Sequence, residues 1–182
     1  SQSKGTDVTV RAELLERLWR AGEVSTADYL IQLKQTLDTA LAGASIRLPP
    51  GIYQGPAVIT KPLTLEGDGK VIIDAGGQGT VLTVKADHVT LRGLTLRGSG
   101  DSHDALDGGV MAEGTKLLIE HNVIEDVLFG ISLHKVTDSI IRANRIRSRA
   151  VDSADRGDGL RFWYSTGNRI EALFKPIGVV EG

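Results

Sequence analysis

The sequence predicts a mainly β fold: a right-handed parallel β-helix of about five coils that follows an N-terminal α-helical hairpin. Three observations support this prediction. After residue 45, short apolar runs recur at irregular intervals, glycine-led runs alternate with them, and charged residues of alternating sign follow the first set of runs. Two short strands in every irregular repeat are typical of a parallel β-helix, in which each repeat forms one coil.

Composition favours the same fold and excludes several functional classes. Hydrophobic residues make up 41% of the 182 residues and aromatic residues only 4%, while 22 glycines are available for bends. Such an aliphatic composition suits thin β layers. The formal net charge of −2 argues against a nucleic-acid surface. No apolar run reaches the roughly 20 residues that cross a bilayer. The absence of cysteine excludes disulfides and thiolate metal sites.

Residues 1–44 are expected to form a helical N-terminal cap, and residues 45–182 the β-helix. Apolar residues recur at helical spacing before Gly22, at Leu14, Leu15, Leu18 and Trp19. Ser25 and Asp28 have the spacing of a capping box and precede a second helix that extends to Gly43. The second helix carries a leucine stripe, namely Leu30, Leu33, Leu37 and Leu41. Pro49 and Pro50 end the helical region, because proline does not continue a helix.

The first set of runs predicts stacked strands with one inward residue each. These inward residues are Leu65, Leu91, Ile119, Ile141 and Ile170, at successive spacings of 26, 28, 22 and 29 residues. The next residue of each run then points outward, and these five alternate in sign: Glu66, Arg92, Glu120, Arg142 and Glu171. Because neighbouring strands lie about 4.8 Å apart, we expect a stabilising charge ladder. Asn122 and Asn144 occupy equivalent positions and predict a structural amide ladder.

The second set of runs begins with glycine each time. Its members are Gly79-Thr-Val81, Gly109-Val110, Gly130-Ile131, Gly159-Leu160 and Gly178-Val179. We expect these strands to form another face of the same coils, with the segments between the two sets turning the corners.

With the repeats aligned, residues 45–171 resemble the NosD family of periplasmic β-helix proteins, which belong to the carbohydrate-binding and sugar-hydrolase (CASH) repeat group. The matching stretches, in the family's order, are "LPPGIYQGPAVITKPLTLEGDG" (48–69), "VTLRGLTLRGSG" (89–100), "DVLFGISLH" (126–134), "IIRANRIRSR" (140–149) and "RGDGLRFWYSTGNRIE" (156–171). The resemblance implies a periplasmic accessory of nitrous oxide reductase maturation that works beside a membrane ABC transporter. It also implies delivery or processing of copper or sulfur, with a copper chaperone as partner.

The sequence departs from that family at both ends. The family continues for several more coils, whereas this chain breaks into "ALFKPIGVVEG" after residue 171. Residues 17–43, "RLWRAGEVSTADYLIQLKQTLDTALAG", are similar instead to a helical segment of TolC-type outer-membrane efflux proteins. We therefore interpret the chain as a truncated NosD-like β-helix with a foreign cap, from a recombinant cassette or an engineered fusion. One alternative is accordingly an interaction module without the family's function. The first nine residues hold no hydrophobic signal region, so any secretion signal was removed or never present.

An outward stripe of the second set is the first candidate site. If Val110, Ile131 and Leu160 point inward, the outward residues form two stacked rows: Met111, Ser132 and Arg161, then Glu113, His134 and Trp163. His134, Met111 and Glu113 could hold copper, because imidazole and thioether suit Cu(I). No spacing matches an established metal motif, and a plain exposed patch is the alternative. Arg161 and Trp163 suit a sugar or a protein partner.

Two loops carry further candidates. The loop "GSGDSHDALDGG" (98–109) supplies a cluster that could bind a cation or act as an acid–base pair: Asp101, His103, Asp104 and Asp107. A polar turn is the alternative, because Asp and Gly are common turn residues. The insertion at residues 152–159 adds Arg156 and Asp158.

We expect a scaffold or binding accessory without catalysis of its own. A carbohydrate-binding or polysaccharide-acting β-helix, a lyase or hydrolase, is the alternative, but no second acidic cluster lies in the register of Asp101–Asp107. We also expect homo-oligomers, because the last coil leaves strand edges unpaired.

Overall fold

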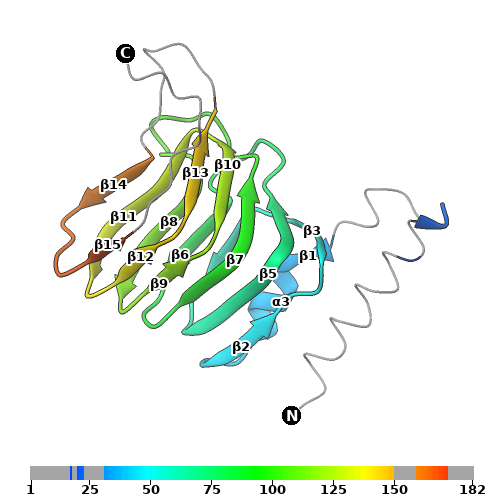
Figure 1. Ribbon diagram of the computed structural model, residues 1–182, viewed down its shortest axis with the longest axis horizontal. Coiled ribbons are helices and arrows are strands. Elements are labelled where there is room, and N and C mark those ends of the chain that lie inside the picture. Colours follow the sequence, from blue (N-terminus) through cyan, green and yellow to red (C-terminus); the bar gives the residue numbers. More distant parts are fainter. Residues whose placement is uncertain (1–16, 18–19, 23–30, 150–158, 172–182) are drawn as a thin grey trace.

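The computed structural model describes residues 17, 20–22, 31–149 and 159–171, which are almost entirely β (Figure 1). The elements are β1 (Ile31–Gln32), α3 (Leu33–Thr39), β2 (Ala44–Arg47), β3 (Gly51–Gln54), β4 (Ala57–Ile59), β5 (Leu63–Asp74), β6 (Leu82–Lys85), β7 (Thr90–Arg97), β8 (Gly108–Thr115), β9 (Leu118–Glu120), β10 (Val123–Val127), β11 (Phe129–Thr137), β12 (Ile140–Arg142), β13 (Arg145–Ser148), β14 (Leu160–Trp163) and β15 (Arg169–Glu171). No helix in these ranges is long and apolar enough to span a bilayer.

The strands form two parallel sheets. The larger sheet has the order β1-β3-β5-β7-β9-β12-β15, with β2 paired to β5 and with β10 between β7 and β13. The smaller sheet has the order β14-β11-β8-β6-β4. Figure 1 shows the strands of both sheets stacked side by side along the molecule. The arrangement is consistent with the predicted parallel β-helix, whereas the number of coils stays a prediction.

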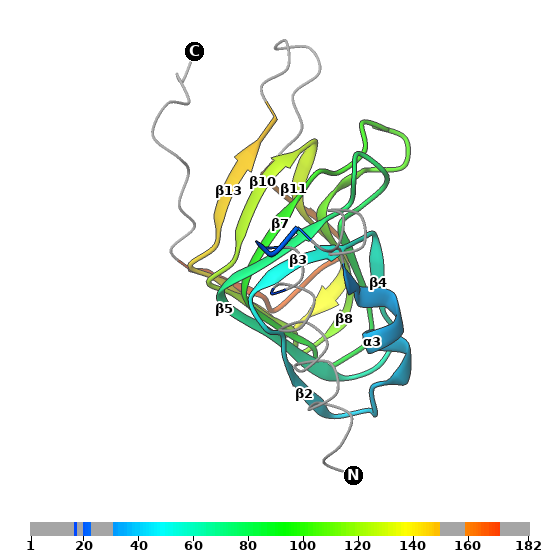
Figure 2. The same ribbon diagram turned by 90° about the vertical axis from the view of Figure 1, so that its right-hand side faces the viewer.

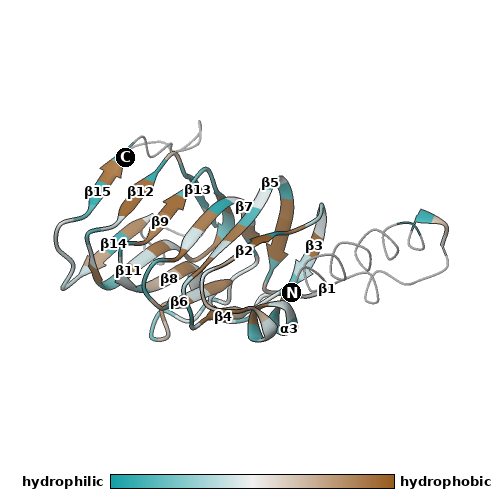
Figure 3. Cartoon of the chain, turned by 90° about the horizontal axis from the view of Figure 1, so that it is seen from below, coloured by the Kyte–Doolittle hydropathy of each residue, from teal (hydrophilic) through white to brown (hydrophobic). Residues whose placement is uncertain are grey.

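The register confirms the first set of predicted strands. Leu65, Leu91, Ile119, Ile141 and Ile170 are successive partners across β5, β7, β9, β12 and β15. The first four are at most 1% exposed, and Ile170 on the last strand is 39% exposed. Hydrophobic and hydrophilic residues accordingly alternate along the strands in Figure 3, as the period of two requires. The charges of the ladder also follow this register, and Arg47 on β2 extends it opposite Glu66.

The second set is confirmed with one correction. Val110, Ile131 and Leu160 are in register across β8, β11 and β14, but Leu82 and not Val81 lies opposite Val110 on β6. The glycines that lead these strands permit close approach of the backbone. A Cβ on Gly130, for example, would lie 2.2 Å from the carbonyl oxygen of Gly159. The predicted strand at Gly178-Val179 lies outside the described residues.

The N-terminal helical prediction is only partly met. β1 pairs with β3, and the following helix α3 ends at Thr39, short of the predicted Gly43. Leu33 and Leu37 are buried in the core, and α3 packs beside β4 (Figure 2). Leu41, expected on the buried stripe, is 68% exposed because the helix has already ended. Leu14, Leu15, Leu18, Trp19 and the Ser25–Asp28 pair lie outside the described residues, so the hairpin cap and the boundary at residue 44 stay predictions.

Many turns between strands use left-handed backbone. Ten described residues other than glycine have φ between 49° and 56°. Gly93, His121 and Ala143 occupy an equivalent turn, each directly after a charge-ladder residue. L-residues with a side chain rarely adopt this conformation. The stack therefore fixes the turns strongly enough to hold such residues in left-handed geometry.

Candidate functional site

The outer face of the smaller sheet brings the predicted stripe together. Ser132 on β11 lies opposite Met111 on β8 and Arg161 on β14, and His134 lies opposite Trp163. Ser132 is only 1% exposed, and its Oγ has no hydrogen-bond partner in the described part of the chain. Neighbouring side chains therefore cover Ser132, whereas Met111 and Arg161 of the same row are partly exposed.

Glu113 lies where the register between β8 and β11 changes, so its place in the stripe stays a prediction. The register of β8 and β11 shifts between Leu133 and Val136, where Lys135 has φ of 52°. Two residues of β11 thus oppose one of β8, as in a β-bulge. The sequence pattern of alternate residues could not predict this insertion. Within the described residues, no group of three His, Cys, Asp or Glu side chains could hold a metal ion.

Met111 and His134 line one hollow of about 290 Å³ on this face. Its other lining residues are Leu106, Trp163 and Tyr164. The rings of His134 and Tyr164 meet edge to face, with their centroids 6.0 Å apart. Tyr164 is 83% exposed, and Trp163 is partly exposed. The hollow is therefore an accessible, mainly aromatic depression.

Arg161 lies between two aromatic rings beside this hollow. Its guanidinium carbon is 4.6 Å from the ring centroid of Phe129 and 4.7 Å from that of Trp163. Cation–π contacts of this kind orient the guanidinium and hold the rings apart. We call Phe129, His134, Arg161, Trp163 and Tyr164 the aromatic cluster. Sequence reasoning missed Phe129, because its ring acts through contacts with Arg161 and with the distant loop 98–109.

The acidic residues of that loop do not converge on one point. Asp107 is 7% exposed, and its carboxylate accepts a 3.0 Å hydrogen bond from the Ser102 amide. Asp101 forms an ion pair with Arg149, while Asp104 is exposed. The ring of His103 packs edge to face on Phe129, at 5.7 Å between centroids. Asp101 and Asp107 thus have structural roles in the loop, which favours the polar-turn interpretation. Arg156 and Asp158 lie outside the described residues.

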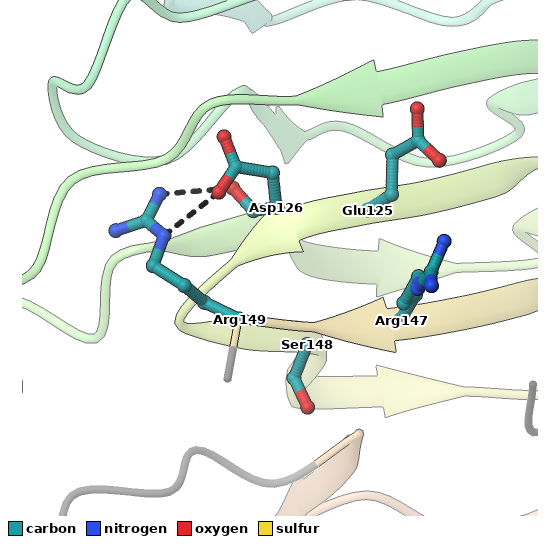
Figure 4. A pocket seen from close by; sticks show the side chains of 5 residues that line it. All are labelled: Glu125, Asp126, Arg147, Ser148 and Arg149. Carbon is teal, nitrogen blue, oxygen red and sulfur yellow. Dashed lines mark hydrogen bonds and ion pairs between the residues drawn. The ribbon is translucent and has the colours of Figure 1, made fainter. Parts of the chain in front are cut away.

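Arg149 fastens the loop to β10. Its Nε donates to the Asp126 carboxylate at 2.9 Å, and its Nη2 donates to the carbonyl oxygens of Ser99 and Asp126, both at 2.9 Å. Figure 4 shows the guanidinium facing Asp126. Burial alone would lower the pKa of Arg149, but the Asp126 and Asp101 carboxylates outweigh it and raise that pKa. Arg149 therefore remains a cation that joins the loop to the sheet.

The charge ladder of the larger sheet centres on Glu120. Arg92 Nε and Arg142 Nε donate to its two carboxylate oxygens at 2.7 and 2.6 Å. Glu120 is 4% exposed, whereas the sequence predicts that the charges of the ladder lie at the surface. Burial alone would raise the pKa of Glu120. The hydrogen bonds and charges of Arg92 and Arg142 outweigh this effect, so the pKa of Glu120 lies below its ordinary value.

A second ladder, which sequence reasoning missed, runs along the other half of the larger sheet. Asp74, Arg97, Glu125 and Arg147 are successive register partners on β5, β7, β10 and β13. Arg97 Nε donates to Asp74 at 2.8 Å. The signal was present in the sequence, because these residues also alternate in sign at the ends of stacked strands. A hollow of about 340 Å³ lies beside its last members, lined by Glu125, Asp126, Arg147, Ser148 and Arg149.

Comparison with known proteins points to one group of relatives. No family model matches the chain. The chain is 32% identical over 127 residues to "Probable ABC transporter binding protein NosD" of Stutzerimonas stutzeri, covering 68% of this chain and 29% of the relative. It is 30% identical over 119 residues to the protein of the same name from Pseudomonas aeruginosa PAO1, covering 64% and 28%. The chain thus spans less than a third of these relatives. The likeness of residues 17–43 to efflux proteins is not supported by these comparisons.

Proposed function

We propose that this chain, which is similar to NosD proteins over about two thirds of its length, is a non-catalytic accessory that binds a protein partner through the aromatic cluster. The observation that carries this proposal is the accessible hollow between His134, Trp163 and Tyr164, flanked by the stacked Arg161. Trp, Tyr and Arg are the residue types enriched in the energetic centres of protein interfaces.

The names of the relatives support one kind of partner. They are described as probable ABC transporter binding proteins, which supports a component of an ABC transporter as the partner. The periplasm is the compartment that we propose from the resemblance to the NosD family. From the resemblance to the NosD family we also propose a specific role for this accessory, the maturation of the copper enzyme nitrous oxide reductase. The proposed lack of catalysis is supported by Asp101 and Asp107, whose carboxylates are engaged within the fold.

The test is a binding titration with the purified ABC transporter of the genome that encodes this chain, held in detergent. We expect Trp163→Ala to weaken binding at least tenfold, since truncating an interface centre costs about 2 kcal/mol or more. Val58→Ala is the matched control, because Val58 is 47% exposed on β4 at the other end of the same sheet. Equal affinity of both variants and the parent chain would refute this surface.

A copper site is the second candidate, because Met111 and His134 line the same hollow. A thioether and an imidazole are suitable ligands for Cu(I). Anaerobic titration of Cu(I) should show one stoichiometric site that His134→Ala and Met111→Leu both remove. His88→Ala is the control and should retain the site, because His88 lies at a turn and does not line the hollow. Retained binding in the first two variants would exclude the hollow as the copper site.

Homo-oligomers remain part of the proposal. The support is the exposure of Phe162 and Ile170, 45% and 39%, on β14 and β15. Their register partners Leu133 and Ile141 are fully buried, so both positions belong to the inner rows of the sheets. Light scattering at increasing concentration should show association that Phe162→Ser reduces. A constant monomer mass would refute it.

A further inference from the structure

The larger sheet carries an apolar row on its outer face. Across β3, β5, β7 and β10 the inward residues are fully buried, so the residues on either side of them point outward. The outward residues form two rows of register partners: Ile52, Ile72, Thr95 and Val123 in the first, and Gln54, Asp74, Arg97 and Glu125 in the second. Three of the four residues in the first row are aliphatic and half-buried. A solvated sheet face usually has polar residues at such positions.

Both rows lie in the middle of the sheet. β3, β5, β7 and β10 belong to the unbroken described range 31–149, and each has a paired strand on both sides. The surface is therefore the face of four internal strands and includes no strand edge. Its side chains reach solvent, since those of Asp74 and Arg97, which form an ion pair of 2.8 Å, are 31% and 35% exposed.

The second row is complementary to itself when its order is reversed. From β3 to β10 it consists of an amide, a carboxylate, a guanidinium and a carboxylate. A two-fold axis parallel to the strands and between β5 and β7 places Asp74 of one copy opposite Arg97 of the other. It also places Gln54 opposite Glu125, which forms no ion pair within the described part of the chain. Opposite charges in contact stabilise such a pairing, and like charges destabilise it.

We propose that this face is the contact between two copies of the chain related by that two-fold axis. The axis places Ile72 opposite Thr95 and Ile52 opposite Val123, so the apolar rows also meet, at the spacing of about 10 Å between packed sheets. Each surface contacts its own equivalent, as in most homodimers. Two rows make a small interface, so we expect association in the micromolar range or weaker. The contact does not involve the last coil and is independent of the proposed function.

The first test is sedimentation velocity of the full chain over a range of concentrations. Ile72→Lys should weaken dimerisation at least tenfold, because it places an unpaired charge in the apolar row. Val58→Lys is the matched control and should leave dimerisation unchanged, since Val58 is 47% exposed on the outer face of the smaller sheet. A monomer at every concentration, or equal effects of the two substitutions, would overturn the proposal.

The second test exchanges the charges of one pair. Asp74→Arg combined with Arg97→Asp keeps an ion pair within each copy, so a purely structural role of the pair predicts no change in association. Copies of this exchanged variant should associate with one another as the parent copies do. A mixed dimer opposes carboxylate to carboxylate and guanidinium to guanidinium, so it should be at least tenfold weaker. Energy transfer between copies labelled at the N-terminus measures all three combinations, and free mixing of parent and exchanged variant would refute the two-fold contact.

Discussion

Asn144 Oδ1 accepts two hydrogen bonds from Asn122, one from the backbone N and one from Nδ2, each 3.1 Å long. Asn122 in turn accepts a hydrogen bond from the Leu94 amide and donates one to the Leu91 carbonyl, each 3.0 Å long. Asn144 also donates to the Ile119 carbonyl at 2.8 Å. Both asparagines are at most 1% exposed. These side chains therefore satisfy buried backbone groups that the turns leave without strand partners.

We predict that Asn122→Ala lowers the free energy of unfolding by about 3 kcal/mol. The substitution leaves the buried Leu94 amide and Leu91 carbonyl without their hydrogen-bond partner. Urea unfolding followed by circular dichroism measures the loss. Asn168→Ala is the matched control, since Asn168 makes similar bonds but is only partly buried. A loss no greater than that of Asn168→Ala would contradict the importance of burial.

Glu120→Gln should lower the free energy of unfolding at pH 7 by about 2 kcal/mol, because it removes the buried carboxylate that forms ion pairs with both Arg92 and Arg142. Arg92 and Arg142 are 37% and 42% exposed, which keeps this loss below that of a fully buried pair. Glu171→Gln is the control, because Glu171 is more exposed and ends the ladder. An equal loss in both variants would contradict a special role for Glu120.

The same carboxylate predicts a pH dependence. Since the folded-state pKa of Glu120 lies below its ordinary value of 4.5, its stabilisation is complete above that value and is lost as pH falls through the folded-state pKa. The stability difference between the parent chain and Glu120→Gln should therefore shrink as pH falls below 4.5. Urea titrations from pH 7 to pH 3 check this, and a constant difference would argue against it.

Arg149→Met should loosen the loop at residues 98–107 while leaving the strands folded. The substitution removes the bonds to Ser99, Asp101 and Asp126 but keeps much of the aliphatic volume. We expect faster hydrogen exchange at the Ser102 and Asp107 amides, which close the loop. Arg147→Met, two residues away, should not change these rates. Equal rates in both variants would show that Arg149 does not hold the loop.

Ala143→Gly should raise the free energy of unfolding by up to about 1 kcal/mol. Ala143 has φ of 53°, and glycine adopts this conformation without the steric penalty of a Cβ. Ala112→Gly is the control and should be destabilising, because Ala112 is buried in strand β8. Thermal unfolding of both variants compares the effects. A lower melting temperature for Ala143→Gly would mean that unfolded-state entropy outweighs strain at this turn.

Repetition explains which features the sequence could predict. The partners of Glu120 and Asn122 stand at equivalent positions of neighbouring repeats, so aligning the repeats also identified their contacts. Arg149 has no such guide toward Asp101, because that partner lies 48 residues away in a loop and not at an equivalent position of the neighbouring repeat. The β-bulge at Lys135 likewise changes the alternation locally, next to Glu113, and the metal trio of His134, Met111 and Glu113 stays a prediction.

The N-terminal error has a different cause. The leucine spacing of residues 30–41 indicated a helix, and Leu33 and Leu37 do face the core from α3. β1 precedes the helix, however, and pairs with β3 in parallel. Lys61 Nζ donates to the carbonyl oxygens of Asp38 and Ala40, at 3.1 and 2.6 Å, where the helix ends. These tertiary contacts limit the helix, and no pattern within residues 30–41 encodes them.

Register partners along the first ladder show how this architecture accommodates change in length. Arg92 and Glu120 are 28 residues apart, whereas Glu120 and Arg142 are 22 apart, yet both pairs meet in the same way. The difference lies mainly in one connection: residues 98–107 link β7 to β8, whereas Leu128 alone links β10 to β11. Insertions and deletions there can therefore accumulate during evolution without disturbing the stacked strands. The same turns are suitable places to graft foreign peptides, with the loop at residues 98–107 as the first to exchange, because its residues 101–105 are all exposed.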